Sequence, residues 1–392
     1  MNNQDLEYLL NNNPFKYKNY YKDVPTSNLE IQESYLKSSV INYKKIKAEK
    51  SIRNRYQILD LNDNSIFELR ELQYPNNGKN IRKLVEDKLK TEKYISQFGI
   101  NTPQSKVYHM SEREIAKQES FTKKEKIVIK PLSSSRGRGV QVNVSKDRFD
   151  INWEIVKKAL RLKNEYILVQ NVVEGFEARA TIIEGELLSI MVRVPPYVTG
   201  NGKNTISELI EVKNNDREKC DFRKDMLITQ SETNREFIEA QGMNFDYIPA
   251  DEENILLNSI SNIAYGGETI NITGLVCKEI KEEALNAMGS IPNLNTCGID
   301  IMMTSFDDSN PVILEINSYP FLSIPYLPTY GKGRNPTKFY VESLVAMHQK
   351  INQPSKRYHI ENEDRYISNY LSLNKRRQDL INKVMKNLPV YK

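Results

Sequence analysis

The sequence predicts a mixed α/β (α+β) fold, and three observations support this prediction. First, residues 81–98 place apolar side chains at helical spacing. Second, residues 127–144 and residues 297–317 each contain two short strand-like runs separated by a polar turn, a pattern typical of β-hairpins. Third, the 392 residues are enough for two or three compact units of ~150 residues. We therefore expect helices and antiparallel strand pairs in more than one unit.

The remaining elements follow from the same patterns. Two strand-like runs around a turn at residues 61–64 predict a hairpin, and residues 1–40 suggest short helices or irregular structure. Apolar spacing and breaking residues predict further helices. These are expected near residues 150–162, 205–220, 234–241, 338–349 and 361–388.

The composition is that of an ordinary soluble globular chain, with 39% hydrophobic and 27% charged residues. No apolar run approaches the ~20 residues that span a bilayer, and no basic segment followed by an apolar core marks a secretion signal at the start. The three cysteines are odd in number and scattered, which argues against a disulfide framework. We expect a cytoplasmic protein without a membrane partner.

The net charge of +5 is modest, because 56 basic residues are interspersed with 51 acidic ones. Basic clusters occur only at residues 43–55 and 374–377, where solvated helix faces explain them. We therefore expect no nucleic-acid partner. An RNA-binding protein is kept as the hypothesis from a different class, and it would require aromatic side chains interleaved with these basic residues.

The hairpin at residues 297–317 carries the most informative polar residues. Asp300 lies near the start of one strand, and Glu315 and Asn317 lie at the end of the other. Paired strands would bring these three oxygen-bearing side chains face to face, and hard cations such as Mg²⁺ choose such ligands. The alternative interpretation is a surface hairpin with solvated acids.

The segment at residues 127–144 has the features of a phosphate-binding flap. An apolar strand ends at Lys130, a Ser/Gly loop covers residues 133–139, and an alternating strand follows. Glycines and serines let backbone N–H groups turn toward an anion, and Lys130 adds a point charge. A Walker-type loop is excluded because no Gly-Lys-Ser/Thr runs into a helix. The alternative is an ordinary polar hairpin with a basic turn.

Together these motifs resemble the ATP-grasp superfamily, with most similarity to the ligase domains of cyanophycin synthetases and bifunctional glutathione synthetases. The resemblance covers roughly residues 80–345. Its other segments, in family order, are the Asp87-Lys88 and Thr91 helix, residues 166–175 with Glu177 and Arg179, residues 193–196 with 200–206, residues 261–268, and residues 330–335.

The resemblance implies an ATP-grasp fold, in which the nucleotide is held between two α/β subdomains. It divides the chain into an N-terminal extension and pre-ATP-grasp region (1–80), the ATP-grasp catalytic domain (81–350) and a helical tail (351–392). The flap-bearing lid is expected at about residues 107–185.

The resemblance also implies roles for individual residues. The catalytic residues would be Arg193, Arg334 and Lys130. The cofactor-binding residues would be Lys88, Lys130, Ser133, Ser134, Ser135, Gly137, Gly139, Gln170, Val172 and Glu177. The metal ligands would be Asp300, Glu315 and Asn317, and the substrate would contact Arg179, Lys203, Asn258, Asn262 and Gly267.

The implied activity is that of an ADP-forming carboxylate–amine ligase that acts through an acyl phosphate. Its cofactors would be ATP and Mg²⁺, with Mn²⁺ as the alternative cation, and its substrates amino acids or small peptides. Two alternatives stay open, namely a ligase that modifies a peptide or protein carrier and a nucleotide- or RNA-binding protein that kept the fold without catalysis. The sequence leaves a homodimer open.

Four departures from the family pattern concern the substrate side. Asn201, Asn258 and Asn271 stand where these ligases carry charged residues, and Ser318 follows Asn317 in place of the family's proline. An amide both donates and accepts, and it suits a neutral polar group better than a free charge. The sequence therefore predicts a different substrate from that of the glutathione ligases.

Overall fold

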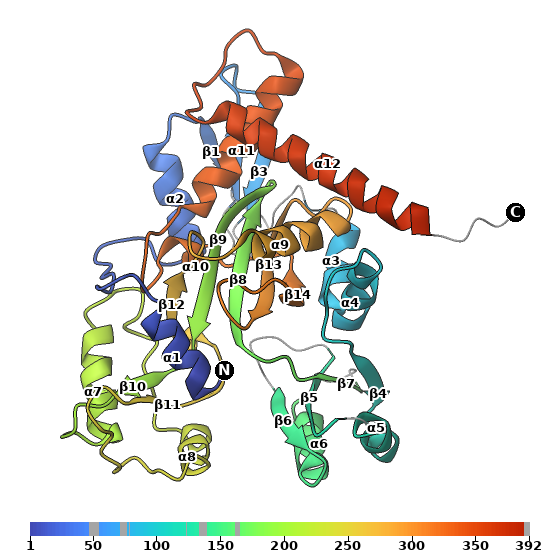
Figure 1. Ribbon diagram of the computed structural model, residues 1–392. Coiled ribbons are helices and arrows are strands. Elements are labelled where there is room, and N and C mark those ends of the chain that lie inside the picture. Colours follow the sequence, from blue (N-terminus) through green and yellow to red (C-terminus); the bar gives the residue numbers. More distant parts are fainter. Residues whose placement is uncertain are drawn as a thin grey trace, which may run out of the picture.

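The computed structural model describes residues 1–46, 55–70, 77, 79–122, 124–132, 139–160 and 165–387. It confirms the mixed α/β (α+β) prediction. A five-stranded sheet lies at the centre of the molecule, and a separate four-stranded sheet with two helices lies beside it (Figure 1). We call the second unit the lid and the remainder the base.

The central sheet is antiparallel throughout, in the order β12-β9-β8-β13-β14. Its strands are β8 (Phe176–Ile183), β9 (Glu186–Val194), β12 (Glu268–Asn271), β13 (Thr296–Met303) and β14 (Val312–Asn317). The predicted hairpin at residues 297–317 is confirmed, because β13 pairs with β14.

The two faces of the central sheet differ because successive side chains of a strand alternate between faces. Ala178, Ile299 and Ile316 belong to the main apolar core on one face. This face packs against α9 (Lys278–Ser290) and α1 (Asn3–Asn11), whose Leu6 and Leu9 are fully buried. The alternate positions of the same strands therefore carry their polar side chains on the opposite face.

The lid sheet has the order β4-β7-β5-β6. Its elements are β4 (Lys106–His109), α5 (Arg113–Ser120), β5 (Lys126–Pro131), β6 (Gln141–Ser145), α6 (Phe149–Lys158) and β7 (Tyr166–Asn171). Trp153 of α6 is fully buried in the core of this unit. The expected lid boundary at residue 185 is wrong, because β8 pairs with β9 and β13 in the central sheet. The lid sheet ends at Asn171.

The predicted helical stretch at residues 81–98 forms two helices, α3 (Lys79–Glu86) and α4 (Lys88–Ser96). Asp87 divides them by leaving the helical conformation and accepting a hydrogen bond from the Lys90 N–H, as an N-cap does. The Thr91 hydroxyl donates to the Leu84 carbonyl at 2.8 Å and ties α4 back to α3. Lys88 is thereby fixed at the first position of α4.

The N-terminal region contributes to two parts of the fold. The predicted hairpin is confirmed as β2 (Arg55–Leu59) and β3 (Ser65–Arg70), with β1 (Tyr43–Ile46) as a third strand. Together with α2 (Asn28–Ser38), this sheet packs near α11 (Pro336–Asn352). Because α1 lies in the main core instead, the first helix is part of the central unit and not of a separate extension.

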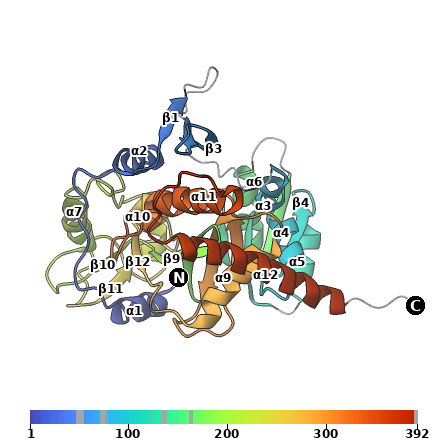
Figure 2. The same cartoon turned by 90° about the horizontal axis from the view of Figure 1, so that it is seen from above.

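The other predicted helices are confirmed. They are α6, α7 (Ile206–Arg217), α8 (Glu232–Glu239), α11 and α12 (Glu363–Asn387), and the remaining elements are β10 (Tyr197–Thr199), β11 (Asn254–Leu256), η1 (Ile263–Tyr265) and α10 (Ser323–Tyr326). Figure 2 shows α12 running beside α9 and α11, and both helices contact it. Within the described residues, none of the helices has both the length and the apolar run that crossing a bilayer requires.

Candidate nucleotide and metal site

The strand register assembles a polar cluster on the face of the central sheet opposite the main core. Asp300 on β13 pairs with Arg179 of β8 on one side and with Glu315 of β14 on the other. Asn317 lies two residues beyond Glu315 and so shares its face. The prediction that Asp300, Glu315 and Asn317 face one another across paired strands is therefore confirmed, while their role as metal ligands stays a prediction.

Two arginines surround the Asp300 carboxylate. Arg179 donates to it through Nε at 2.5 Å and through Nη2 at 2.6 Å, a bidentate contact. The Arg193 Nη2 atom lies 3.3 Å from Asp300 Oδ1 and also forms an ion pair with Glu177. Burial alone would raise the pKa of Asp300, but the two guanidinium groups outweigh it and hold the pKa below its usual range. Asp300 is therefore ionised at neutral pH.

Two lysines approach this cluster, one from the base and one from the lid. The Lys88 Nζ atom lies 3.6 Å from Glu315 Oε2. Lys130 lies next to the end of β5 of the lid. Burial and the charge of Lys88 lower its pKa to about 8, although Glu315, Glu92 and Asp300 act in the opposite direction. A phosphate group placed here would add negative charge beside the two ammonium groups.

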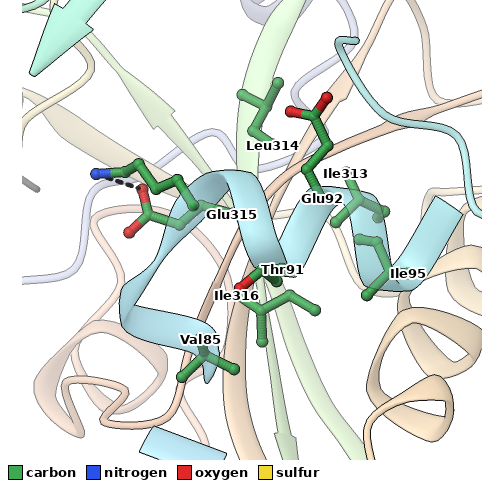
Figure 3. Close-up of a pocket in the computed structure, with 9 residues that line it drawn as sticks. Val85, Thr91, Glu92, Ile95, Ile313, Leu314, Glu315 and Ile316 are labelled. Atoms are coloured by element: carbon green, nitrogen blue, oxygen red, sulfur yellow. Dashed lines mark ion pairs between the residues drawn. The ribbon is translucent and has the colours of Figure 1, made fainter. Parts of the chain in front are cut away.

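A cavity of about 10 Å³ lies between α4 and β14, beside the Lys88–Glu315 pair. Its lining combines apolar residues with Lys88, Thr91, Glu92 and Glu315, and Figure 3 shows the two glutamates among them. This volume holds about one water molecule. The cavity is thus a small gap with a mixed lining beside the cluster and is too small to hold a nucleotide.

The predicted metal ligands fit a hard divalent cation. Asp300, Glu315 and Asn317 supply only oxygen donors from one face, which is the ligand set that Mg²⁺ selects. Among the residues described, the buried Asn317 Nδ2 atom has no hydrogen-bond partner. A bound ligand near this amide would account for a polar atom that is otherwise costly to bury.

Three of the predicted cofactor-binding residues follow the connection from the lid to the base. Gln170 is buried on β7, Val172 lies in the linker, and Glu177 lies at the start of β8. The structure brings Glu177 into the cluster through Arg193. These three residues lie in order along one edge of the boundary between the two units.

The predicted phosphate flap is described only in part. Ser133, Ser134, Ser135 and Gly137 lie outside the described residues, and their phosphate-binding role stays a prediction. Gly139 has φ +73°, and a Cβ there would lie 2.5 Å from the Ala159 Cβ. Only glycine suits this position. The turn and the packing on the end of α6 explain why a glycine is needed here without any role in phosphate binding.

Arg334 is not brought to the cluster. It donates to the Leu188 carbonyl at 3.0 Å, forms an ion pair with Glu186 at 3.2 Å and stacks over Phe339. Glu186 and Arg193 are seven residues apart on β9, which places them about 23 Å apart. The expectation that Arg334 is catalytic is therefore corrected, since its side chain anchors the segment before α11 to the start of β9.

Of the predicted substrate residues, only Arg179 joins the cluster. Lys203 is exposed in the loop before α7, Asn258 is buried and donates to Asn234 at 2.6 Å, and Asn262 caps η1. Gly267 lies against the end of β9, where a Cβ would come within 2.7 Å of the Val194 carbonyl oxygen. A Cβ at Gly267 would also lie 3.0 Å from the Asn262 carbonyl oxygen. The role of these four residues in substrate binding stays a prediction.

A second charged cluster, not predicted from the sequence, lies on the other face of the sheet. Glu268 of β12 pairs with Val194, whereas Thr269 pairs with Arg193, so Glu268 points away from Asp300. Its carboxylate accepts from the Tyr197 hydroxyl at 3.1 Å. Lys18 and Lys213 approach it to 3.1 and 3.5 Å.

Lys18 reaches Glu268 from a segment that we call the N-terminal strap (residues 13–23). The strap is held by Asn19, whose N–H donates to the Thr329 carbonyl at 2.8 Å, and by the Tyr21 hydroxyl, which donates to the Pro328 carbonyl at 2.9 Å. No sequence pattern identifies Lys18, because its partner Glu268 is far from it in the sequence. Glu92, which lines the cavity, was also missed, although its position one helical turn after Lys88 was a usable signal.

Comparison with known proteins agrees with this geometry. Residues 85–321 match the model of the ATP-grasp domain family. The chain is 32% identical over 260 residues to the glutathione biosynthesis bifunctional protein GshAB of Clostridium perfringens (strain 13 / Type A), covering 64% of this chain and 33% of that protein. It is 30% identical over 223 residues to the cyanophycin synthetase of Synechocystis sp. (strain ATCC 27184 / PCC 6803 / Kazusa), covering 53% and 24%. The chain thus spans about a quarter to a third of these relatives' lengths.

Among solved structures, the chain is similar to a bifunctional glutathione synthetase from Pasteurella multocida. The TM-score is 0.56 at 20% identity, over 82% of this chain and 43% of that one. A likeness at this identity concerns the fold. The family match covers more than half of the chain, so this protein belongs to the ATP-grasp family.

Proposed function

We propose that this protein is an ATP-dependent carboxylate–amine ligase that forms ADP and passes through an acyl phosphate. The observation that carries the proposal is the cluster at the boundary of lid and base, where Lys88 pairs with Glu315 and the charges of Lys88, Glu315 and Asp300 act on Lys130. The cluster lies within the part of the chain that matches the ATP-grasp domain. It combines cations for phosphates with oxygen ligands for a metal.

The proposed first step joins two anions, because a carboxylate oxygen attacks the γ-phosphorus of ATP and ADP leaves. Catalysis of such a step consists mainly of positioning and charge neutralisation. Lys88 at the start of α4 and Lys130 at the end of β5 would bind the phosphates from opposite units. An amine then attacks the acyl carbon, phosphate leaves, and the amine loses a proton.

Asp300, Glu315 and Asn317 would hold Mg²⁺, with Mn²⁺ as the alternative cation. When bound, the cation supplies Lewis acidity and neutralises charge on phosphate oxygens. Arg179 holds the Asp300 carboxylate in a fixed orientation through its bidentate contact. Glu315 is more accessible, with 31% of its side chain exposed, and it faces the boundary with the lid.

Arg193 is the proposed partner of the substrate carboxylate and of the acyl phosphate. Its Nη2 atom contacts Glu177 and Asp300, while its buried Nε atom has no partner among the described residues. A guanidinium with unused donors binds a planar carboxylate well. Closure of the lid over this group would exclude water, which would otherwise hydrolyse the acyl phosphate.

The proposed substrates are amino acids or small peptides, as the family resemblance implies. The expectation of an acceptor other than the γ-glutamylcysteine and glycine pair rests on the sequence departures alone, because the Asn201, Asn258 and Asn271 amides are all hydrogen-bonded within the protein. A cytoplasmic location, the absence of a nucleic-acid partner and the oligomeric state stay predictions from the sequence.

A phosphate-release screen tests the proposal. Purified protein is incubated with ATP, Mg²⁺ and pairs of amino acids or small peptides, and the nucleotide products are separated. We expect ADP and phosphate with at least one pair, and no comparable activity from Glu315→Gln. Formation of AMP and pyrophosphate would instead mean adenylation and would contradict the acyl-phosphate mechanism.

A further inference from the structure

The lid is joined to the base by two chain segments, residues 97–105 and 172–175. In the second segment, Gly175 has φ +105°, and a Cβ there would lie 2.1 Å from the Met303 carbonyl oxygen. Only glycine allows this close contact between two backbones. The exit from the lid is therefore fixed to the base by main-chain packing.

The entry to the lid is fixed by a side chain instead. Gln104 adopts a left-handed conformation, with φ +60°, which is uncommon for a residue with a Cβ. The next residue, Ser105, donates its N–H to Glu92 Oε1 at 2.5 Å and its hydroxyl to Glu92 Oε2 at 2.6 Å. Both carboxylate oxygens of Glu92 thus hold the residue that precedes β4.

Glu92 also lies close to the nucleotide cluster. It occupies α4 one turn after Lys88, and it lines the same cavity as Glu315 (Figure 3). Its charge is one of those that act on Lys130 across the boundary. One carboxylate of the base therefore contacts the start of the lid from the helix that carries Lys88.

We propose that Glu92 is a positioning residue that clamps Ser105 and so sets the angle at which the lid holds Lys130 against the base. Hydrogen bonds to an ionised carboxylate are stronger than neutral ones, and the two bonds here constrain both the backbone and the side chain of Ser105. The inference rests on the proposed nucleotide site, because the benefit of a fixed lid angle is retention of the nucleotide phosphates.

The test compares four variants of the full chain. Glu92→Ala removes both acceptors, Ser105→Ala removes one donor, and the double variant removes the whole contact. The matched control is Glu119→Ala, because Glu119 accepts from Lys106 Nζ at 3.0 Å and the Tyr108 hydroxyl at 2.9 Å entirely within the lid. Release of a fluorescent ATP analogue with Mg²⁺ is followed by stopped flow, and lid position without nucleotide by small-angle scattering.

We expect Glu92→Ala to release the analogue about tenfold faster and to widen the scattering profile. Ser105→Ala should have a smaller effect, and the double variant should match Glu92→Ala because the two residues act through one contact. Glu119→Ala should lower the melting temperature without changing release. Additive effects of the two single changes, or a lower melting temperature with unchanged release in Glu92→Ala, would overturn the proposal.

If the unmodified protein does not bind the analogue, the proposed nucleotide site fails, and scattering alone decides the clamp. A wider profile for Glu92→Ala than for Glu119→Ala would then support the clamp. Equal profiles for these two variants would refute it.

Discussion

The central sheet carries two charged clusters on opposite faces, and they differ in what covers them. The Asp300 cluster lies at the boundary between the base and the lid, and it receives Lys130 from the lid. The Glu268 cluster is closed by the N-terminal strap, which contributes Lys18, and only 2% of the Glu268 side chain is exposed. By comparison, 31% of the Glu315 side chain is exposed.

The difference shows how to separate binding charges from structural ones. In the Glu268 cluster, burial would raise the pKa of the carboxyl, but Lys213 and Lys18 outweigh it and lower the pKa to about 2. The carboxylate is therefore satisfied within the protein. The lysine pKa does not separate the clusters, because burial lowers it in both, to about 7 for Lys213 and to about 8 for Lys130. Accessibility does separate them, since Glu268 is enclosed whereas Glu315 is partly exposed beside Lys88. Only the Asp300 cluster is therefore accessible to a ligand.

The largest expected effect comes from breaking the Glu268 cluster, which the N-terminal strap closes. Glu268→Gln leaves Lys213 and Lys18 without their counter-charge, and such a change costs about 3–5 kcal/mol of unfolding free energy. Urea denaturation measures it. Affinity for Mg²⁺ and an ATP analogue, measured below the unfolding transition, should be unchanged; a selective loss of affinity at normal stability would make this cluster part of the binding site.

The next largest effect comes from a change in the Asp300 cluster at the boundary of base and lid. Glu315→Gln removes one anionic metal ligand, and turnover should fall by about a hundredfold or more. The melting temperature of the nucleotide-free protein should change little, because the side chain is partly exposed. Asp308→Asn, in the turn of the same hairpin, is the control, and turnover at the wild-type level in Glu315→Gln would refute the metal assignment.

A smaller effect should appear in the pH dependence of stability. Because the folded pKa of Lys130 is about 8 and the unfolded value is about 10.4, the folded state carries the full cost of this charge below pH 8. The cost is relieved as the pH rises from about 8 to 10. Lys130→Met should remove it, raising the free energy of unfolding at pH 7 by up to about 3 kcal/mol and reducing its rise above pH 8.

This prediction is measured by urea denaturation of the nucleotide-free protein at pH 7, 8, 9 and 10. Lys126→Met, at the exposed start of the same strand, is the control and should leave the profile unchanged. A lower stability of Lys130→Met at pH 7 would show that the lysine is already satisfied within the protein.

The smallest effect should come from removing the charge of Lys18 in the N-terminal strap. Lys18 is 23% exposed and is one of two lysines on Glu268, so Lys18→Met should cost about 1 kcal/mol. The loss should appear in the melting temperature alone. Weaker nucleotide binding in this variant would mean that the two faces of the sheet are coupled.

Local sequence patterns predicted that Asp300 and Glu315 lie together, but they gave no indication of the Glu268 cluster. The hairpin that aligns Asp300 with Glu315 follows from strand alternation around one turn, so its register could be predicted from adjacent residues. Lys130 was found because it lies where an apolar strand ends before a Ser/Gly loop, whereas Lys88 was found only through the family resemblance. The general fold and most helices follow from the same short-range signals.

The failures involve contacts between distant segments. Lys18 meets Glu268, and Arg334 meets Glu186, only after the whole chain has folded, and neither pairing has a local signal. Arg334 was assigned to catalysis from its motif, while its hydrogen bonds lie at the far end of β9. The lid boundary was placed too late because β8 continues directly from the linker after β7, and only sheet pairing shows which unit it joins.

The most direct test of the account is calorimetric titration with a non-hydrolysable ATP analogue and Mg²⁺. Wild-type protein, Lys130→Met and Lys18→Met are compared at pH 7.5. We predict that Lys130→Met loses at least tenfold in affinity, while Lys18→Met binds as the wild type does. Equal affinities for all three proteins, or a loss confined to Lys18→Met, would contradict the claim that the nucleotide binds at the boundary of lid and base.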